Sequence, residues 1–126
     1  MAPSDLPAPD PAEPCPLVGC MDLLGGAWTP NIVWHLAAGP RRFSHLKREL
    51  SPVSGKVLTA RLRKMMEDGL VLREVAPTSP PAVSYALTDL GHELKPAIAA
   101  IVEVGLKLQA RAKAREAEAQ RVLRGE

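Results

Sequence analysis

The spacing of hydrophobic residues changes from a helical to a strand period at Gly69. The residues before it carry one apolar stripe at helical spacing, made of Leu58, Leu62, Met65 and Met66. Ser54 is a favourable N-cap for this helix, and Gly69 is a favourable terminator. Beyond Gly69, residues 71–75 and 83–87 alternate around the proline-rich turn 77–81, which predicts a two-stranded hairpin. We therefore expect a helix that leads directly into a hairpin.

Helices are also predicted on both sides of this unit. Three short helices precede it, and the first begins at Pro16. Thr29 caps the second helix and Ser44 caps the third. After the hairpin, Thr88 caps a longer final helix, which Pro96 is expected to kink or delay.

The order of these elements predicts a mainly α (α+β) fold, a winged helix-turn-helix with a two-stranded wing and with N- and C-terminal dimerisation helices. Three regions are expected along the chain. Residues 1–14 form a disordered proline-rich arm, because their composition cannot bury a core. Residues 15–110 form the DNA-binding and dimerisation domain, and residues 111–126 form a charged tail that is helical or frayed.

Basic residues are concentrated in the middle of the chain. Residues 1–40 contain four acids and no base, whereas residues 41–73 contain nine bases and three acids, a net charge of +6. Such a cluster is typical of a phosphate-binding surface. The apolar runs fall short of the roughly 20 residues that span a membrane, and the first 40 residues lack the basic opening of a secretory signal. A cytoplasmic protein is expected.

One face of the predicted helix after Ser54 is suited to reading base edges. Lys56, Thr59, Ala60 and Arg63 share that face at helical spacing, opposite the apolar stripe. Lysine, threonine and arginine supply hydrogen-bond donors, and small residues permit close approach to a groove. The same charges also suit a solvated helix surface, so that alternative stays open for Lys56 and Arg63.

Short motifs occur in a defined order along residues 15 to about 105. They are Cys15-Pro16, Gly25-Gly26-Ala27-Trp28, Trp34-His35-Leu36, Gly39-Pro40-Arg41-Arg42-Phe43, Leu58-Thr59, Leu62, Glu67-Asp68-Gly69-Leu70-Val71, Pro80-Pro81 and Tyr85-Ala86-Leu87-Thr88. Their order and spacing resemble the HxlR family of regulators, which is related to MarR-like regulators. The resemblance implies a dimeric DNA-binding regulator whose helix after Ser54 enters the major groove and whose wing is formed around residues 78–81. Ala27 and Ala82 depart from the family pattern, in which a basic residue is frequent at both positions.

The expected DNA contacts combine this helix with the basic stretch and the wing. They are Arg41, Arg42, Lys47, Ser54, Lys56, Thr59, Ala60, Arg63, Arg73 and Ser79. The first and last helices are expected to build a homodimer. Its interface residues are Leu17, Met21, Leu94, Ile98, Ile101 and Leu108. The expected partner is a palindromic operator in double-stranded DNA with half-sites about 34 Å apart.

Two cysteines bear on regulation. Cys15 lies at a helix N-cap, where the helix dipole can stabilise a thiolate, so it is a candidate sensor of oxidants or electrophiles. An inert surface thiol is the alternative, and a small-molecule effector also stays open. Cys20 falls on the apolar stripe of the first helix, with Leu17, Met21 and Leu24, and is expected to pack in the core. The two thiols point in different directions from one helix and should not bridge within it, whereas a disulfide between subunits stays open.

Other classes of function receive little support from the residue pattern. No group of His, Cys, Asp and Glu has metal-ligand spacing, so no metal or cofactor is predicted. Cys15 has no nearby histidine base and no glycine motif for an oxyanion, so an enzyme is not expected. The remaining alternative is a winged-helix module that docks an acidic protein without binding DNA.

Overall fold

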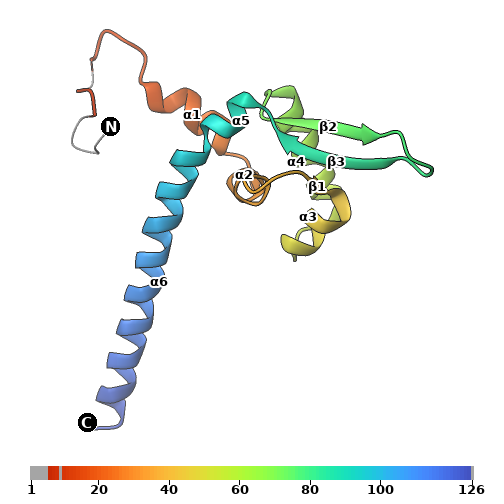
Figure 1. Cartoon of the computed structure of the whole chain (residues 1–126). Helices are drawn as coiled ribbons and strands as arrows, with labels where there is room; N and C mark the ends of the chain where they lie inside the picture. The colour runs from red at the N-terminus through yellow and green to blue at the C-terminus, as the bar shows by residue number, and fades with distance from the viewer. Residues whose placement is uncertain (1–5, 9, 126) are drawn as a thin grey trace.

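The computed structural model describes residues 6–8 and 10–125 of the chain (Figure 1). Its elements, in chain order, are α1 (Pro16–Leu24), α2 (Thr29–Leu36), β1 (Arg41–Arg42), α3 (Phe43–Glu49), α4 (Gly55–Glu67), β2 (Val71–Ala76), β3 (Ala82–Leu87), α5 (Asp89–Glu93) and α6 (Lys95–Leu123). The predicted arm falls partly outside the described residues, which omit 1–5 and 9. Its described residues, 6–8 and 10–14, form no helix or strand.

The core lies where α2, α3, α4 and the beginning of α6 meet the base of the hairpin. Its most completely buried side chains are Ile32, Val33, Leu36, Leu46, Leu58, Leu62, Met65 and Leu70. They come from α2, α3, α4 and the turn before β2, so one hydrophobic cluster fixes α4 against the rest of the body. None of the helices in the described part of the chain is long and apolar enough to cross a membrane.

The boundaries of α4 agree with the sequence prediction. Ser54 adopts an extended conformation, and its Oγ accepts a hydrogen bond from the Val57 backbone N–H at 3.1 Å. Gly69 has a φ of 78°, a left-handed conformation that a side chain would strain. The chain can therefore turn directly from α4 into β2.

The predicted hairpin is confirmed, and the structure adds one strand to it. β2 and β3 pair antiparallel from Val71 opposite Leu87 to Ala76 opposite Ala82. β1 pairs with the other edge of β3, so the sheet order is β1-β3-β2. A strand of two residues is too short to show an alternating pattern, which is why the sequence did not reveal it.

Two predicted caps were wrong. Ser44 is the second residue of α3, because β1 ends at Arg42 and the helix begins at once at Phe43 without a side-chain cap. Thr29 is the first residue of α2, and the capping position belongs to Trp28, which has a φ of 70°. Both helices rely on packing of their apolar residues rather than on a capping side chain.

Pro96 delays the last helix instead of kinking it. Thr88 is a cap as predicted, since its Oγ accepts a hydrogen bond from the Gly91 backbone N–H at 3.1 Å, but it caps a separate short helix, and the long last helix begins after Leu94 without a side-chain cap. The short α5 ends at Glu93, and α6 then begins with Pro96 in its first turn. From there α6 runs 29 residues as one helix. The predicted tail is thus helical as far as Leu123 and continuous with the body of α6, which projects from the rest of the fold (Figure 1).

Candidate nucleic-acid interface

The predicted DNA-reading face of α4 is open to solvent. Lys56, Thr59, Ala60 and Arg63 are all exposed, whereas Leu58, Leu62 and Met65 on the opposite face are buried. Neither Lys56 nor Arg63 forms an ion pair or hydrogen bond with any described residue. Both cations are therefore available to an external anion or base edge.

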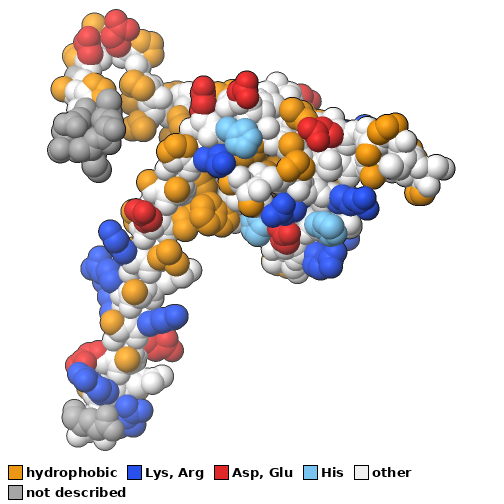
Figure 2. All heavy atoms as spheres, in the orientation of Figure 1, with side chains coloured by type: hydrophobic (Ala, Val, Ile, Leu, Met, Phe, Trp, Pro, Cys, Tyr) orange, Lys and Arg blue, Asp and Glu red, His pale blue; other side chains and the backbone are white. Residues whose placement is uncertain are grey.

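The turn between α3 and α4 adds a second basic surface. An open hollow of about 700 Å³ lies there, lined by Ser44, Lys47, Arg48, Ser51, Pro52 and Val53. Lys47 is directed to the beginning of α4, because a Cβ built on Gly55 would lie 3.9 Å from its Nζ. The unpaired N–H groups at a helix N-terminus attract anions, so Lys47 and this helix end can act on the same phosphate. Figure 2 shows lysine and arginine side chains gathered on this part of the body.

Arg41 is less available than the sequence suggested. Its Nη1 donates hydrogen bonds to the carbonyl oxygens of Pro40 at 3.0 Å and Gly39 at 3.4 Å. Its Nε lies 3.5 Å from Glu49 Oε1, while His35 Nδ1 lies 2.8 Å from Glu49 Oε2. The hydrogen bond from His35 lowers the pKa of the Glu49 carboxyl, with the charge of Arg41 acting in the same direction against desolvation. Glu49 thus neutralises part of the positive charge of residues 41–73.

Three other residues that were predicted to contact DNA lie on the sheet or in its hairpin turn. Arg42, Arg73 and Ser79 are exposed, on β1, on β2 and in the hairpin turn respectively. In that turn, Thr78 Oγ1 donates a hydrogen bond to the Pro80 carbonyl at 2.8 Å, so this hydroxyl already has an internal partner. The hairpin extends away from α4 (Figure 1), and its tip carries Ser79 without a nearby lysine or arginine.

The predicted dimer residues fall into two groups. Leu17, Met21, Ile101 and Leu108 are exposed by 67%, 58%, 56% and 58%. Leu94 and Ile98 are only 8% and 2% exposed, because the beginning of α6 packs into the core of the same chain. The expectation that these two side chains form a dimer seam is therefore corrected.

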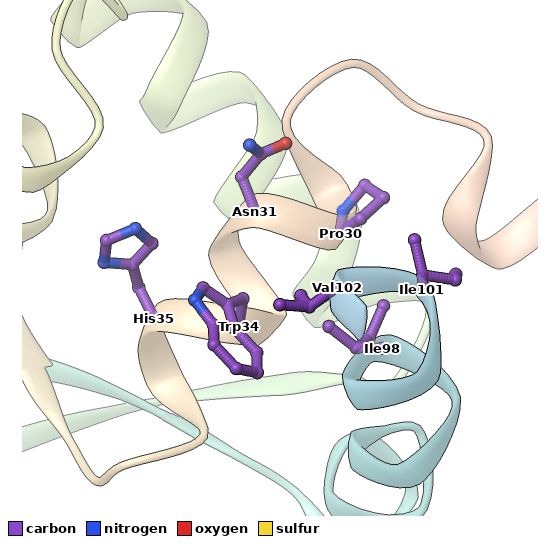
Figure 3. Close-up of a pocket in the computed structure, with 7 residues that line it drawn as sticks. All are labelled: Pro30, Asn31, Trp34, His35, Ile98, Ile101 and Val102. Carbon is purple, nitrogen blue, oxygen red and sulfur yellow. The ribbon is translucent and has the colours of Figure 1, made fainter. Parts of the chain in front are cut away.

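A shallow groove of about 200 Å³ lies between α2 and α6. Pro30, Asn31, Trp34, His35, Ile98, Ile101 and Val102 line it. In Figure 3 the Trp34 indole faces Ile98 and Val102, while His35 points away from α6. Trp34 remains 46% exposed, so this aromatic surface is incompletely covered within one chain.

The two cysteines occupy different surroundings. Cys15 is exposed at the N-cap of α1, and its side chain makes no capping hydrogen bond. Cys20 is half-buried and packs against the core cluster, and both thiols are free. Oxidants in solution can therefore reach Cys15 more readily than Cys20.

Sequence reasoning missed two of these features. Glu49 was not singled out, because its contact with His35 joins residues 14 apart on different helices and leaves no local pattern. Arg61 was not singled out either, yet it is half-buried, and a Cβ on Gly26 would lie 2.5 Å from its Nη1. The Gly25-Gly26 pair was the available signal, since glycine often marks a close approach of another group.

Comparisons with known proteins agree with this architecture. A profile of the HxlR-like helix-turn-helix family matches residues 23–113. The HTH-type transcriptional regulator YdeP of Bacillus subtilis is 34% identical over 102 residues, which cover 81% of this chain and 80% of YdeP. YybR, another HTH-type transcriptional regulator of that organism, is 36% identical over 93 residues, which cover 74% of each chain.

Solved structures of transcriptional regulators have folds similar to that of this chain. The redox regulator HypR in its reduced form is 31% identical, with a TM-score of 0.73 over 79% of this chain and 99% of HypR. The reduced transcriptional regulator YodB from Bacillus subtilis is 32% identical, with a TM-score of 0.61 over 79% of this chain and 92% of YodB. From the fold, the profile match and these relatives, the chain belongs to the HxlR-like helix-turn-helix family of transcriptional regulators.

Proposed function

We propose that this regulator binds double-stranded DNA sequence-specifically, with α4 in the major groove. The exposed face of α4 carries the proposal, because Lys56 and Arg63 are exposed there and pair with none of the residues that the structure describes. Thr59 and Ala60 lie between them, so the backbone of α4 can approach the bases closely. In this arrangement Arg63 and Lys56 read base edges or phosphates, and the Ala60 methyl group contacts a thymine methyl.

The phosphate backbone is held around this helix. Lys47 and the N-terminal end of α4 at Ser54 bind one phosphate, and Arg42 binds another from β1. Arg73 and Ser79 supply weaker contacts from the wing. Arg41 contributes less than its neighbour Arg42, because it is already paired with Glu49.

We further propose that the regulator is a cytoplasmic homodimer that binds a palindromic operator. Exposed apolar residues of α1 and α6 support this proposal, since the described part of the chain leaves more than half of each of the side chains of Leu17, Met21, Ile101 and Leu108 exposed. A symmetric dimer presents α4 twice, which suits two half-sites about 34 Å apart.

Cys15 is the proposed sensor of an oxidant or electrophile. Its exposure at a helix N-cap supports this role, and HypR, a structural relative, is described as a redox regulator with oxidised and reduced forms. Modification of this thiol would act on the DNA-bound dimer through α1.

The test is footprinting of the purified protein on the DNA upstream of its own gene. Arg63→Ala and Lys56→Ala should weaken operator protection, and each lost phosphate contact should flatten the dependence of log K on log salt by about 0.9. Lys64→Ala is the matched control on the same helix, because Lys64 is paired with Asp68 at 3.2 Å. Unchanged binding in both Arg63→Ala and Lys56→Ala would reject the assigned face. Retention of an acidic protein without any duplex binding would favour the docking module instead.

A further inference from the structure

Arg61 of α4 is a half-buried cation without an internal partner. Its guanidinium forms no ion pair or hydrogen bond with any residue in the described part of the chain. Burying part of a charged group costs solvation free energy, which an opposite charge ordinarily offsets. The group that offsets this cost must therefore come from outside the described part of the chain, and it must be an anion.

Gly26 leaves the space that this guanidinium occupies. A Cβ built on Gly26 would lie 2.5 Å from Arg61 Nη1 and 2.9 Å from Thr29 Oγ1. Thr29 is buried at the beginning of α2, so it holds one side of this space. Arg61 is thus confined between α4 and the turn that follows α1. A side chain that is already confined loses less rotamer entropy when it binds a ligand.

Arg61 and Arg63 face different sides of α4. Residues two positions apart on an α-helix are separated by about 200° around its axis. Arg63 lies on the exposed face with Lys56, whereas Arg61 is directed to the turn that follows α1. A helix in the major groove lies between two phosphate backbones, one along each wall of the groove. Arg61 and Arg63 therefore cannot both contact the same wall.

The side of α4 next to this turn receives no positive charge from the lysines and arginines of α1 or α2. Residues 1–40 contain four acids and neither lysine nor arginine. A phosphate on this side must therefore be neutralised from α4 itself. A guanidinium suits that task, because its planar fork of N–H donors can bind two phosphate oxygens at once.

We propose that Arg61 binds a phosphate of the operator backbone, on the groove wall next to the α1–α2 turn, and that Gly26 positions it. This contact rests on the DNA binding proposed above and adds a binding residue to it. Lys56 and Arg63 then contact the DNA from the other side of α4. Because the phosphate is the same at every base pair, Arg61 supplies affinity and register but no base preference.

Arg61→Met tests this contact in the full-length protein. Methionine keeps an unbranched side chain of high helix propensity and removes the charge. Operator affinity should fall about tenfold, and the plot of log K against log salt should flatten by about 0.9 for each half-site. Arg61→Lys keeps a charge and should keep the slope. Lys64→Met is the matched control and should also keep it, because Lys64 is already paired with Asp68 at 3.2 Å.

Uncharged methylphosphonates at single operator positions locate the phosphate. One position in each half-site should weaken binding of the original protein about tenfold and leave binding of Arg61→Met unchanged, because that variant has already lost the contact. Lys64→Met should stay sensitive at the same position. Equal sensitivity of Arg61→Met and the original protein at every position would overturn the proposal, as would an unchanged salt slope.

Binding to unrelated duplex DNA distinguishes a phosphate contact from a base contact. Arg61→Met should weaken operator binding and non-specific binding by the same factor, since both duplexes present the same backbone. A loss confined to the operator would assign Arg61 to a base edge and overturn the phosphate contact. Urea unfolding of Arg61→Met should match that of the original protein, because the guanidinium has no internal partner to lose.

Gly26→Ala tests the positioning role. The added methyl group should displace the end of the flexible Arg61 side chain and weaken operator binding about threefold or more. Gly26→Ala combined with Arg61→Met should bind no more weakly than Arg61→Met alone, since both changes act on one contact. A further loss in the combined variant would overturn the positioning role of Gly26.

Footprinting of the same proteins separates the Arg61 contact from the proposed function. Specific operator protection with a salt slope that ignores Arg61→Met would overturn the phosphate contact and leave base reading by α4 standing. Absence of duplex binding in the unaltered protein would overturn the proposed function and the Arg61 contact together.

Discussion

Glu49 accepts a hydrogen bond from His35 at 2.8 Å and thereby joins the end of α3 to α2. The other oxygen of the same carboxylate lies 3.5 Å from Arg41 Nε, at the strand that borders the wing. Three elements of the fold therefore meet at one acidic side chain, within a stretch of sequence that is otherwise strongly basic.

Removing this carboxylate should increase DNA affinity. Glu49→Gln keeps a hydrogen-bonding side chain but releases the charge of Arg41, so the plot of log K against log salt should steepen by up to about 0.9 for one additional phosphate contact. Binding titrations over a range of salt concentrations measure this slope. Glu103→Gln, an exposed acid on α6 away from the proposed DNA-reading face, is the control for a general change in net charge. A slope that changes equally in both variants would contradict a specific effect on Arg41.

The stability of the protein should depend on pH through the same side chain. His35 and Arg41 lower the pKa of Glu49 below its ordinary value of 4.5, so the unfolded chain takes up this proton first as the pH falls. The stabilising effect is thus present above pH 4.5 and is lost as the pH falls through the lowered pKa. Urea unfolding between pH 7 and pH 3 should show a shallower acid loss in Glu49→Gln than in the original protein. An identical pH profile would show that the contact does not persist in solution.

Gly91 should tolerate no side chain. It is buried in α5, and a Cβ there would come into hard contact with the Leu70 carbonyl oxygen and the Leu87 side chain. Gly91→Ala should therefore lower the free energy of unfolding by about 2 kcal/mol or more, in the range that overpacking produces. Gly19→Ala in α1 is the matched control, because a Cβ there meets nothing within 4 Å. That variant should be unchanged or more stable by up to about 1 kcal/mol, since alanine favours a helix. Denaturant unfolding of both variants gives the comparison.

Cys15 should account for any response to oxidants. Treatment with diamide should reduce operator occupancy in the original protein and in Cys20→Ser, because Cys15 is the exposed thiol in both. Cys15→Ser should bind the operator equally well with and without diamide. Gel-shift titrations under both conditions measure the difference. A response that persists in Cys15→Ser would remove Cys15 as the sensor.

Features with a local sequence signal were predicted well. Ser54, Gly69 and Thr88 mark their boundaries because caps and left-handed turns depend on residues within one helical turn. The hairpin followed from strict alternation over enough residues to exclude a helix. The open face of α4 followed from the same periodicity, since burial of Leu58 and Leu62 determines which side faces solvent.

Features that depend on distant contacts could not be predicted in this way. Leu94 and Ile98 fit a seam of exposed residues by spacing alone, but the first turns of α6 pack against the body and bury them. The partner of Arg41 is an acid eight residues later, on another element. Helical periodicity identifies an apolar face, and only the packed structure shows which neighbour covers it.

Arg61 lies so close to Gly26 that a movement of one would displace the other. Arg61 belongs to α4, and Gly26 belongs to the turn that follows α1, the helix that begins beside Cys15. A displacement of that turn by the width of one side chain would displace the guanidinium of Arg61, a residue of the helix that is proposed to read DNA. A change at the proposed sensor Cys15 would in this way reach the helix proposed to read DNA through one side-chain contact, without any rearrangement of the hydrophobic core.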